Sequence, residues 1–181
     1  MSAKRVNPAL EEPSAHDEPS EIRRTFARNL RQAREAAGLT QHALATVAAC
    51  DPRLLANIET RAANVKLDTI TRLARALSVT EIDLLLPAMD NIRIKRGRRP
   101  PVEPLSKTEP TEFRSRFARN LRDRRRAARL YQKVLSNAAG VQVSAVGEIE
   151  VHAVNVTLDT VTRLAKALNV TEIDLLGPED G

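Results

Sequence analysis

Hydrophobic residues near the start of the chain recur at intervals of three and four, the spacing of a helix that buries one face. This stretch follows Ser20, a residue suited to cap a helix N-terminus, and stops at Gly38. Its apolar positions are Ile22, Phe26, Leu30, Ala33 and Ala37. The pattern predicts an amphipathic helix between Ser20 and Gly38.

Two shorter helices are expected next. Thr40 is placed to cap a helix over 41–48, and Asp51 to cap another over 52–60. Pro52 takes the first position of the latter, where its missing N–H costs nothing. Only residues 49–51 separate the two helices, and this arrangement is typical of a helix-turn-helix.

Helical spacing returns with a further apolar set at Leu67, Ile70, Leu73, Ala74 and Leu77. A last helix is expected from Thr80, because its hydroxyl and the carboxylate of Asp83 are spaced as a capping box. Aromatic residues make up only 2% of the chain and Trp is absent, so the core must be built from Leu, Ile, Val and Ala. These features predict an all-α fold.

The segment 19–85 recurs at 110–176 without insertion or deletion, at a constant offset of 91 positions. Of the 67 aligned pairs, 37 are identical, yet the nine pairs from 49/140 to 57/148 contain no identity. Packing and recognition occupy different parts of a small domain, so this divergent strip indicates a recognition surface on a shared scaffold. The repeat predicts two five-helix units.

The predicted organisation has five parts: a disordered acidic tail over 1–18, helix-turn-helix domain 1 over 19–86, a basic Pro-rich linker over 87–109, domain 2 over 110–177 and a short tail over 178–181. A flexible linker of this length spans roughly 25–30 Å. Adjacent half-sites on duplex DNA lie roughly 34 Å apart. Both units are therefore expected to reach one duplex.

The formal net charge is +6, and the basic excess lies in the two units and the linker, whereas both tails are acidic. This distribution favours a polyanionic partner. Cys50 is the only cysteine, so an intramolecular disulfide is excluded, and we find neither a secretory leader nor an apolar stretch of about 20 residues. We expect a cytoplasmic, nucleoid-associated bacterial protein with no membrane partner.

Residues for catalysis or metal binding do not stand out. His16, His42 and His152 share no metal-ligand spacing with one another or with Cys50, which we interpret as a small buried hydrophobe. Glu59 and Glu150 each end a predicted third helix, and we assign them a structural hydrogen-bonding role. We expect no enzyme, no cofactor and no small-molecule ligand.

The string LTQHALATVAACDPRLLANIE, followed by LDTITRLARALSVTEIDLL, closely resembles the Cro/cI-type helix-turn-helix family of phage repressors and their bacterial relatives. Its specific marks are Leu39-x-Gln41-x-x-Leu44-Ala45, Ile58-Glu59 and the Leu-Ala-x-Ala-Leu-x-Val core of helix four. The resemblance covers both copies. It implies five-helix globules in which helix two crosses the DNA backbone and helix three enters the major groove.

For the first copy, the resemblance implies base-facing side chains at Pro52, Arg53 and Asn57. Arg53 is suited to guanine and Asn57 to adenine, whereas Pro52 offers only apolar contact. The expected phosphate contacts, which position the protein without reading sequence, are Arg34, Gln41, Thr60 and Asn64.

For the second copy, the base-facing trio becomes Val143, Ser144 and Glu148. The expected phosphate contacts there are Arg125, Gln132, Lys133 and Asn155. This recognition helix is the weaker candidate, because Glu148 adds negative charge beside phosphates and Gly147 lowers helix propensity by about 1 kcal/mol.

Arginines crowd the first helix of the second copy, and four of them share one face: Arg122, Arg125, Arg126 and Arg129. Such a stripe is explained either by a neighbouring phosphate backbone or by simple solvation. In the linker, Arg96, Arg98 and Arg99 surround a glycine as in the minor-groove AT-hook core. Non-specific phosphate attraction and a merely soluble linker remain open.

These observations lead us to expect a sequence-specific double-stranded DNA-binding transcriptional regulator, a repressor of a phage, plasmid or other mobile-element operon, that reads dissimilar half-sites with two helix-turn-helix units. In the alternative, domain 1 binds DNA while domain 2 is a protein-interaction or dimerisation module that contacts an antirepressor or polymerase. A homodimer, and RNA binding through the arginine stripe, are also open.

Overall fold

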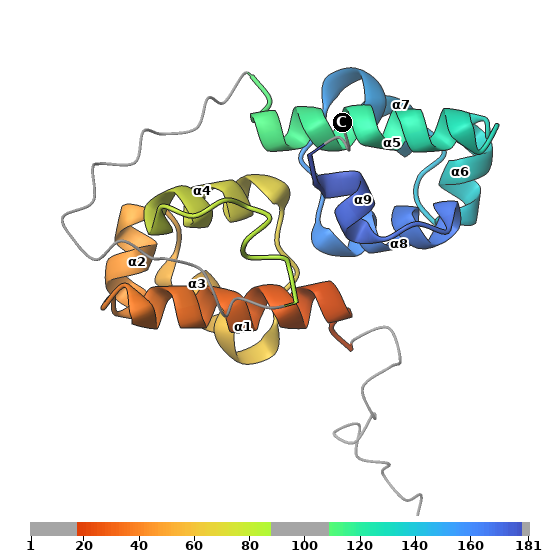
Figure 1. Cartoon of the computed structure of the whole chain (residues 1–181). Coiled ribbons are helices and arrows are strands. Elements are labelled where there is room, and N and C mark those ends of the chain that lie inside the picture. Colours follow the sequence, from red (N-terminus) through yellow and green to blue (C-terminus); the bar gives the residue numbers. More distant parts are fainter. Residues whose placement is uncertain (1–17, 88–108, 179–181) are drawn as a thin grey trace, which may run out of the picture.

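The computed structural model describes residues 18–87 and 109–178, and within these ranges all regular secondary structure is helical (Figure 1). The expected all-α fold is confirmed. We refer to residues 18–87, with helices α1 to α4, as the first unit and to residues 109–178, with helices α5 to α9, as the second unit. The bounds in the first unit are α1 Glu21–Ala36, α2 Gln41–Val47, α3 Pro52–Arg61 and α4 Leu67–Leu77. Those in the second are α5 Glu112–Ala127, α6 Gln132–Ala138, α7 Ala145–His152, α8 Leu158–Leu168 and α9 Glu172–Leu176.

The apolar positions predicted from the sequence form the core. Ile22, Phe26, Leu30 and Ala33 of α1 are buried, and Ala37 beyond its end is half-buried. The helix ends because Gly38 adopts a positive φ of 69°, which directs the chain away from the helical path. The predicted helix-turn-helix caps are also present, since Thr40 accepts from the Ala43 amide and Asp51 from that of Arg53.

Three local predictions differ from the structure. Ser20 precedes α1, but its hydroxyl donates to Asp159 of the second unit instead of capping the helix. Helix α7 begins at Ala145, so Val143 and Ser144 lie in the turn before it. The second copy has Gln142 and Val143 where the first has Asp51 and Pro52, and it therefore lacks both the side-chain cap and the ring that favours a helical start.

The third difference concerns the predicted fifth helices, of which the structure has one. Thr171 and Asp174 form the capping box of α9, whereas 81–85 is a series of turns although Thr80 and Asp83 make the same reciprocal hydrogen bonds. The amide of Leu86 donates to the Ile82 carbonyl, as that of Gly177 does to Ile173. Residues 81–85 and 172–176 thus share their capping hydrogen bonds, and they differ only in that the second segment completes a regular helical turn.

A buried asparagine ties this last segment to the first helix of each unit. Asn29 of α1 donates to the carbonyls of Leu84 (3.3 Å) and Leu86 (2.7 Å). Asn120 of α5 donates to those of Leu175 (3.1 Å) and Gly177 (3.0 Å). These bonds satisfy backbone groups that the short final segment leaves without helical partners.

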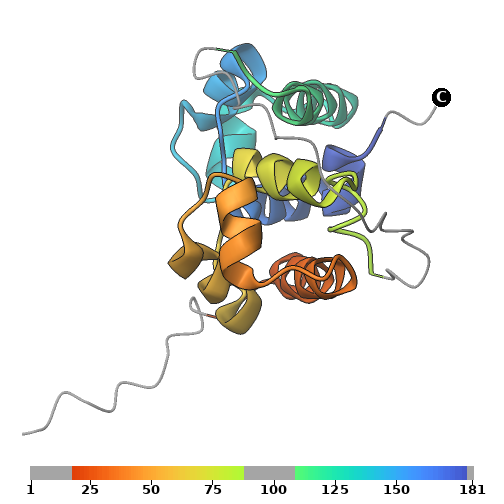
Figure 2. The same ribbon diagram turned by 90° about the vertical axis from the view of Figure 1, so that its left-hand side faces the viewer.

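The two units contact each other through a reciprocal surface. Figure 1 shows α1 and α5 on opposite edges of the molecule, running in opposite directions, and Figure 2 views both nearly end-on. Between them, Lys66 and Thr157 form an isolated antiparallel bridge. The amide of Leu67 donates to the Val156 carbonyl, and the amide of Leu158 donates to that of Val65, both at 3.0 Å.

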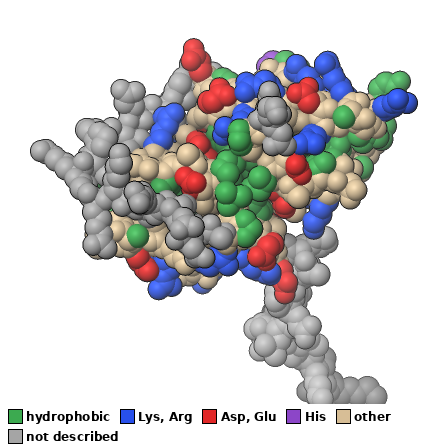
Figure 3. All heavy atoms as spheres, viewed as in Figure 1, with side chains coloured by type: hydrophobic (Ala, Val, Ile, Leu, Met, Phe, Trp, Pro, Cys, Tyr) green, Lys and Arg blue, Asp and Glu red, His purple; other side chains and the backbone are tan. Residues whose placement is uncertain are grey.

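Two further kinds of contact across this surface each occur twice, with the units exchanged. Arg23 pairs with Asp159 at 3.0 Å, and Arg114 pairs with Asp68 at 3.1 Å. The side-chain carbonyl of Asn155 accepts from the Asp68 amide, and that of Asn64 accepts from the Asp159 amide. We call these reciprocal positions the pairing surface: Arg23, Asn64, Val65, Lys66, Leu67 and Asp68, with their counterparts 91 positions later. Hydrophobic side chains gather where the units meet in Figure 3.

Candidate nucleic-acid interface

Helices α2 and α3 are fixed by their buried faces. Leu44 and Ala45 of α2, together with Leu55 and Ile58 of α3, are completely buried. Arg72 of α4 donates to the carbonyl of Ala49 in the intervening turn at 2.9 Å, and Arg163 repeats this contact to Gly140 in the second unit at 3.2 Å. Sequence reasoning missed these two arginines, although both copies carry one. Each connects the turn of its helix-turn-helix to the following helix, α4 or α8.

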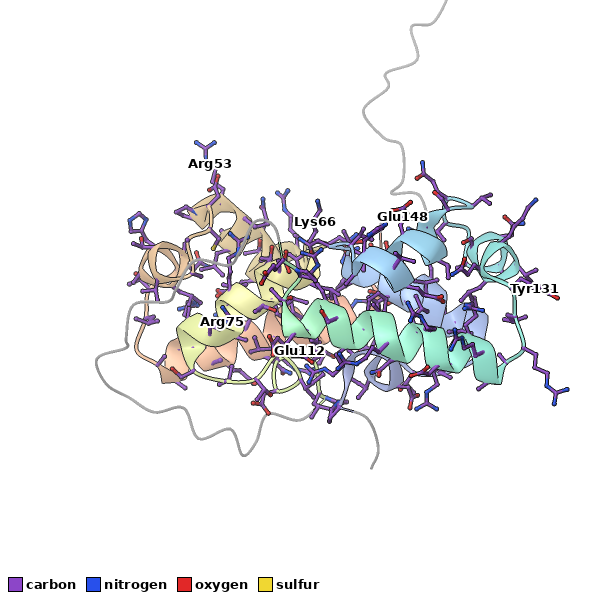
Figure 4. All side chains as sticks on the ribbon, turned by 90° about the horizontal axis from the view of Figure 1, so that it is seen from above. Arg53, Lys66, Arg75, Glu112, Tyr131 and Glu148 are labelled. Carbon is purple, nitrogen blue, oxygen red and sulfur yellow. The ribbon has the colours of Figure 1, made fainter. Side chains whose placement is uncertain are left out.

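The opposite face of α3 is exposed and polar. Pro52, Arg53, Asn57 and Thr60 are exposed, so they are accessible to a partner. The Thr60 hydroxyl donates to the carbonyl of Ala56 at 2.8 Å, one turn back along the helix. Arg53 points away from the body of the molecule in Figure 4. Its guanidinium is suited to a bidentate acceptor such as a guanine edge or a phosphate.

Below this face lies a buried ion pair. Arg34 donates to both oxygens of Glu59, at 2.7 and 2.9 Å, and also to the Leu39 carbonyl. The side chains are only 11% and 2% exposed, and Gln41 adds a hydrogen bond to Glu59 at 2.8 Å. The bond to Glu59 raises the pKa of the Arg34 guanidinium. The structural role predicted for Glu59 is confirmed, because its carboxylate links α1, α2 and α3.

The second unit repeats this arrangement around Glu150. Arg125 donates to its two oxygens at 2.6 and 2.9 Å, and Gln132 donates at 2.9 Å. Burial raises the pKa of the Glu150 carboxyl, but the hydrogen bonds from Arg125 and Gln132 together outweigh burial and leave that pKa below its ordinary value. Arg122 also turns to Glu150 and donates to its carbonyl oxygen.

The arginine stripe on α5 is therefore divided. Arg122 and Arg125 are directed at Glu150, whereas Arg126 and Arg129 are exposed. In the first unit, the counterpart of Arg122 is Arg31, which pairs with Glu35 at 2.9 Å. The second copy has Arg126 in place of Glu35, so Arg122 lacks that neighbouring carboxylate.

The remaining predicted contacts lie in different surroundings. Lys133 is exposed on α6, while Asn64 and Asn155 belong to the pairing surface. Arg34, Gln41, Arg125 and Gln132 use their donors on the buried glutamates. Arg96, Arg98 and Arg99 lie outside the described residues. The phosphate contacts thus remain predictions, and the donors that already bind protein acceptors, Thr60 among them, offer less to a partner than the exposed Lys133 does.

The corresponding surface of the second unit differs in chemistry. The described residues include five large hydrophobic side chains that are exposed, and four of them belong to the second helix-turn-helix: Tyr131 (81%) at the N-cap of α6, Val134 (47%) on α6, Val143 (54%) in the turn and Val151 (66%) on α7. Glu148 is exposed beside them, with an oxygen 4.0 Å from Nε2 of His152. Val151 and His152 replace Thr60 and Arg61 of the first unit. The second surface is therefore less basic and more apolar.

The pairing surface places both third helices on one side of the molecule. In Figure 4, Arg53 of α3 and Glu148 of α7 lie on the same side, with Lys66 between them. Arg75 and Glu112 lie on another side.

The described parts of the chain contain no group of three His, Cys, Asp or Glu residues that could hold a metal ion, and no helix there is both long and apolar enough to cross a membrane.

Comparison with known proteins identifies the first unit. Residues 25–85 match the family model described as a helix-turn-helix domain. The chain is also similar to the restriction-modification controller protein C.AhdI from Aeromonas hydrophila, with 34% identity over 34% of this chain and 94% of that one, at a TM-score of 0.33. Residues 25–85 therefore belong to the helix-turn-helix family.

A second solved structure similar to this helix-turn-helix protein is the hypothetical transcription factor NHTF from Neisseria. It shares 28% identity over 41% of this chain and 92% of that chain, with a TM-score of 0.36. The comparison with curated proteins gave no match. The family model covers α2, α3 and α4 completely and most of α1, so the candidate interface of the first unit lies inside the matched segment.

Proposed function

We propose that this helix-turn-helix protein is a sequence-specific double-stranded DNA-binding transcriptional regulator whose two units read dissimilar half-sites of one duplex. The observation that carries the proposal is the presence of α3 and α7 on one side of a molecule whose halves are joined by reciprocal contacts. A single chain thereby presents two unlike third helices in one fixed arrangement. Membership of the helix-turn-helix family supports the same function.

In this proposal, the first unit supplies most of the sequence discrimination. Arg53 and Asn57 are exposed on α3 and have the side chains suited to guanine and adenine edges. In the second unit, Val143 and Ser144 precede α7, so only Glu148 of the base-facing trio lies on the helix itself. The operator is therefore expected to be asymmetric, with its stricter half under the first unit.

The regulated operon is proposed to be that of a phage, plasmid or other mobile element, with the protein acting as its repressor. Footprinting on the DNA upstream of its own gene tests this. We expect protection longer than one half-site, and an affinity that falls steeply as salt rises because phosphate contacts release counterions. Binding there that is weak and insensitive to salt would contradict the proposal.

A second candidate function is favoured by the four exposed hydrophobic residues on the second helix-turn-helix. Such residues suit a protein partner better than a phosphate backbone, so the first unit would bind DNA while the second contacts an antirepressor, polymerase or another copy. Operator binding by Arg53→Ala and by a Ser144→Ala/Glu148→Ala double variant distinguishes the two. Loss in both supports two reading units, whereas loss only in the former supports the second candidate.

A further inference from the structure

The pairing surface has the properties of an interface between two copies of one protein. Its ion pairs, its backbone hydrogen bonds and its asparagine contacts all occur twice, with the roles of the two units exchanged. In such an isologous contact, the same patch on each side is complementary to itself. Arg23, Asn64, Val65, Leu67 and Asp68 are all identical to the residues 91 positions later. Chemically, either unit could therefore pair with a copy of itself.

The asparagines make the surface more than a set of ion pairs. Helices α4 and α8 have no side-chain cap from their own N-cap residues, Lys66 and Thr157. The amides of Asp68 and Asp159 in their first turns instead receive the side-chain carbonyls of Asn155 and Asn64 from the opposite unit, at 3.1 and 3.2 Å. Each unit thus caps a helix of the other, and separation of the units would leave both helix N-termini without these acceptors.

One position breaks the equivalence of the two sides. Lys66 and Thr157 are counterparts in the repeat, and they also lie opposite each other in the antiparallel bridge. A position that faces its own counterpart lies at the centre of the reciprocal surface. If two first units paired by the same contacts, Lys66 would face Lys66, and like charges directly opposite each other weaken strand pairing. Pairing of a first with a second unit avoids this repulsion.

We propose that the pairing surface is a self-complementary interaction surface whose selectivity residue is Lys66, and that the partner it fits is a second unit, not another first unit. The lysine at one side of the bridge and the threonine at the other favour pairing of a first unit with a second unit. The chain consequently presents one α3 and one α7 on its common side instead of two copies of α3. This inference concerns pairing of the units and does not depend on DNA binding.

Hydrogen exchange on the intact chain tests the proposal. The amides of Leu67 and Leu158 donate across the bridge, and those of Asp68 and Asp159 donate to the opposite asparagines, so all four report opening of the surface. Thr157→Lys would place two lysines opposite each other. We expect exchange at these four amides to become about 1.5- to 5-fold faster, while the amides of Leu30 and Leu121 inside α1 and α5 keep their rates and show that the units remain folded.

The decisive variant exchanges the two residues. Lys66→Thr/Thr157→Lys again places one lysine opposite one threonine, so we expect the four amides to return to their original protection. Arg75→Lys is the matched control, because Arg75 is exposed on α4 and lies on another side of the molecule in Figure 4. Equal exchange in Thr157→Lys and the unsubstituted chain would overturn the selectivity role of Lys66. Unprotected amides at Leu67 and Leu158 in the unsubstituted chain would overturn the pairing surface itself.

Discussion

Gly38 and Arg129 occupy equivalent positions after the first helix of each unit, and both adopt left-handed backbone conformations, with φ of 69° and 55°. Glycine accepts this conformation readily, whereas a residue with a side chain pays about 1–2 kcal/mol for it. The turn between the second and third helices shows the opposite exchange, with Ala49 at φ 49° and Gly140 at φ 61°. Each unit therefore carries strain at one turn that the other unit relieves with glycine.

Arg129→Gly is expected to stabilise the protein. Relief of the left-handed conformation exceeds the extra freedom that glycine gives the unfolded chain, which leaves a net gain of about 0.5–1 kcal/mol. The midpoint of denaturant unfolding at unchanged slope measures this gain. Arg126→Gly is the control, because position 126 is inside α5, and there we expect a loss of about 1 kcal/mol. Equal effects of the two substitutions would show that the backbone at Arg129 is not strained.

Glu150 makes stability depend on pH in the acid range. Its carboxyl pKa is lower in the folded protein than its ordinary value, because the bonds from Arg125 and Gln132 outweigh burial. The stability it contributes is therefore complete above the unfolded pKa, about 4.3, and is lost as the pH falls through the folded pKa. Glu150→Gln removes this titration, so its free energy of unfolding should change less between pH 5 and the acid limit than that of the unsubstituted chain.

A comparison at neutral pH completes this test. There, Glu150→Gln should be less stable by about 1–3 kcal/mol, because Arg125 loses a charged acceptor in a largely buried site. The pKa of Asp174 is also below its ordinary value, mainly because the Thr171 side chain donates a hydrogen bond to its carboxylate. Both proteins contain Asp174, so the difference between their pH profiles reports the contribution of Glu150. Parallel pH profiles would mean that Glu150 does not contribute to acid unfolding.

Arg53→Ala should weaken specific DNA binding by about 1–3 kcal/mol and relax the preference at one base pair. The reason is the loss of the bidentate base contact that we propose for the exposed guanidinium of Arg53. Titration of labelled operator variants at fixed salt measures both effects. Arg75→Ala is the matched control, since it removes the same charge from another side of the molecule (Figure 4). If both variants lost affinity equally, only net charge would be at work.

Asn64→Ala and Asn155→Ala distinguish a capping role from a phosphate contact. If each asparagine mainly caps the opposite helix, either substitution costs about 0.5–2 kcal/mol of stability. The double variant should cost less than the sum, because both caps belong to one surface that opens as a whole. Thermal or denaturant unfolding without DNA measures the cost. Unchanged stability with weaker DNA binding would instead support the phosphate contact predicted from the sequence.

Local sequence patterns were sufficient for most of the helices. The apolar spacing of α1 and α4, Gly38, and the caps at Thr40 and Asp51 act within a few residues of their own positions, so these elements were predictable without a structure. The buried role of Glu59 was predictable too. The late start of α7 was missed, although Gln142 and Val143 in place of Asp51 and Pro52 were a visible signal.

The uses of polar side chains were harder to predict. Arg34 and Arg125 have the charge of phosphate ligands, yet their carboxylate partners lie 25 residues further along the chain and reach them only after α1 packs on α3 and α5 on α7. Asn64 and Asn155 meet their partners only across the pairing surface, 95 and 87 residues away. Sequence patterns give no direct measure of such contacts.

The sequence by itself determined that the chain is helical, that its halves share a scaffold, and that they differ most at the third helix, because periodicity, caps and repeated residues are local or directly countable properties. Only the tertiary structure decided that the halves cap each other's helices, that Lys66 faces Thr157, and that α3 and α7 lie on one side. These relationships depend on which surfaces meet after each unit has folded, and a linker of suitable length allows many such meetings without specifying one.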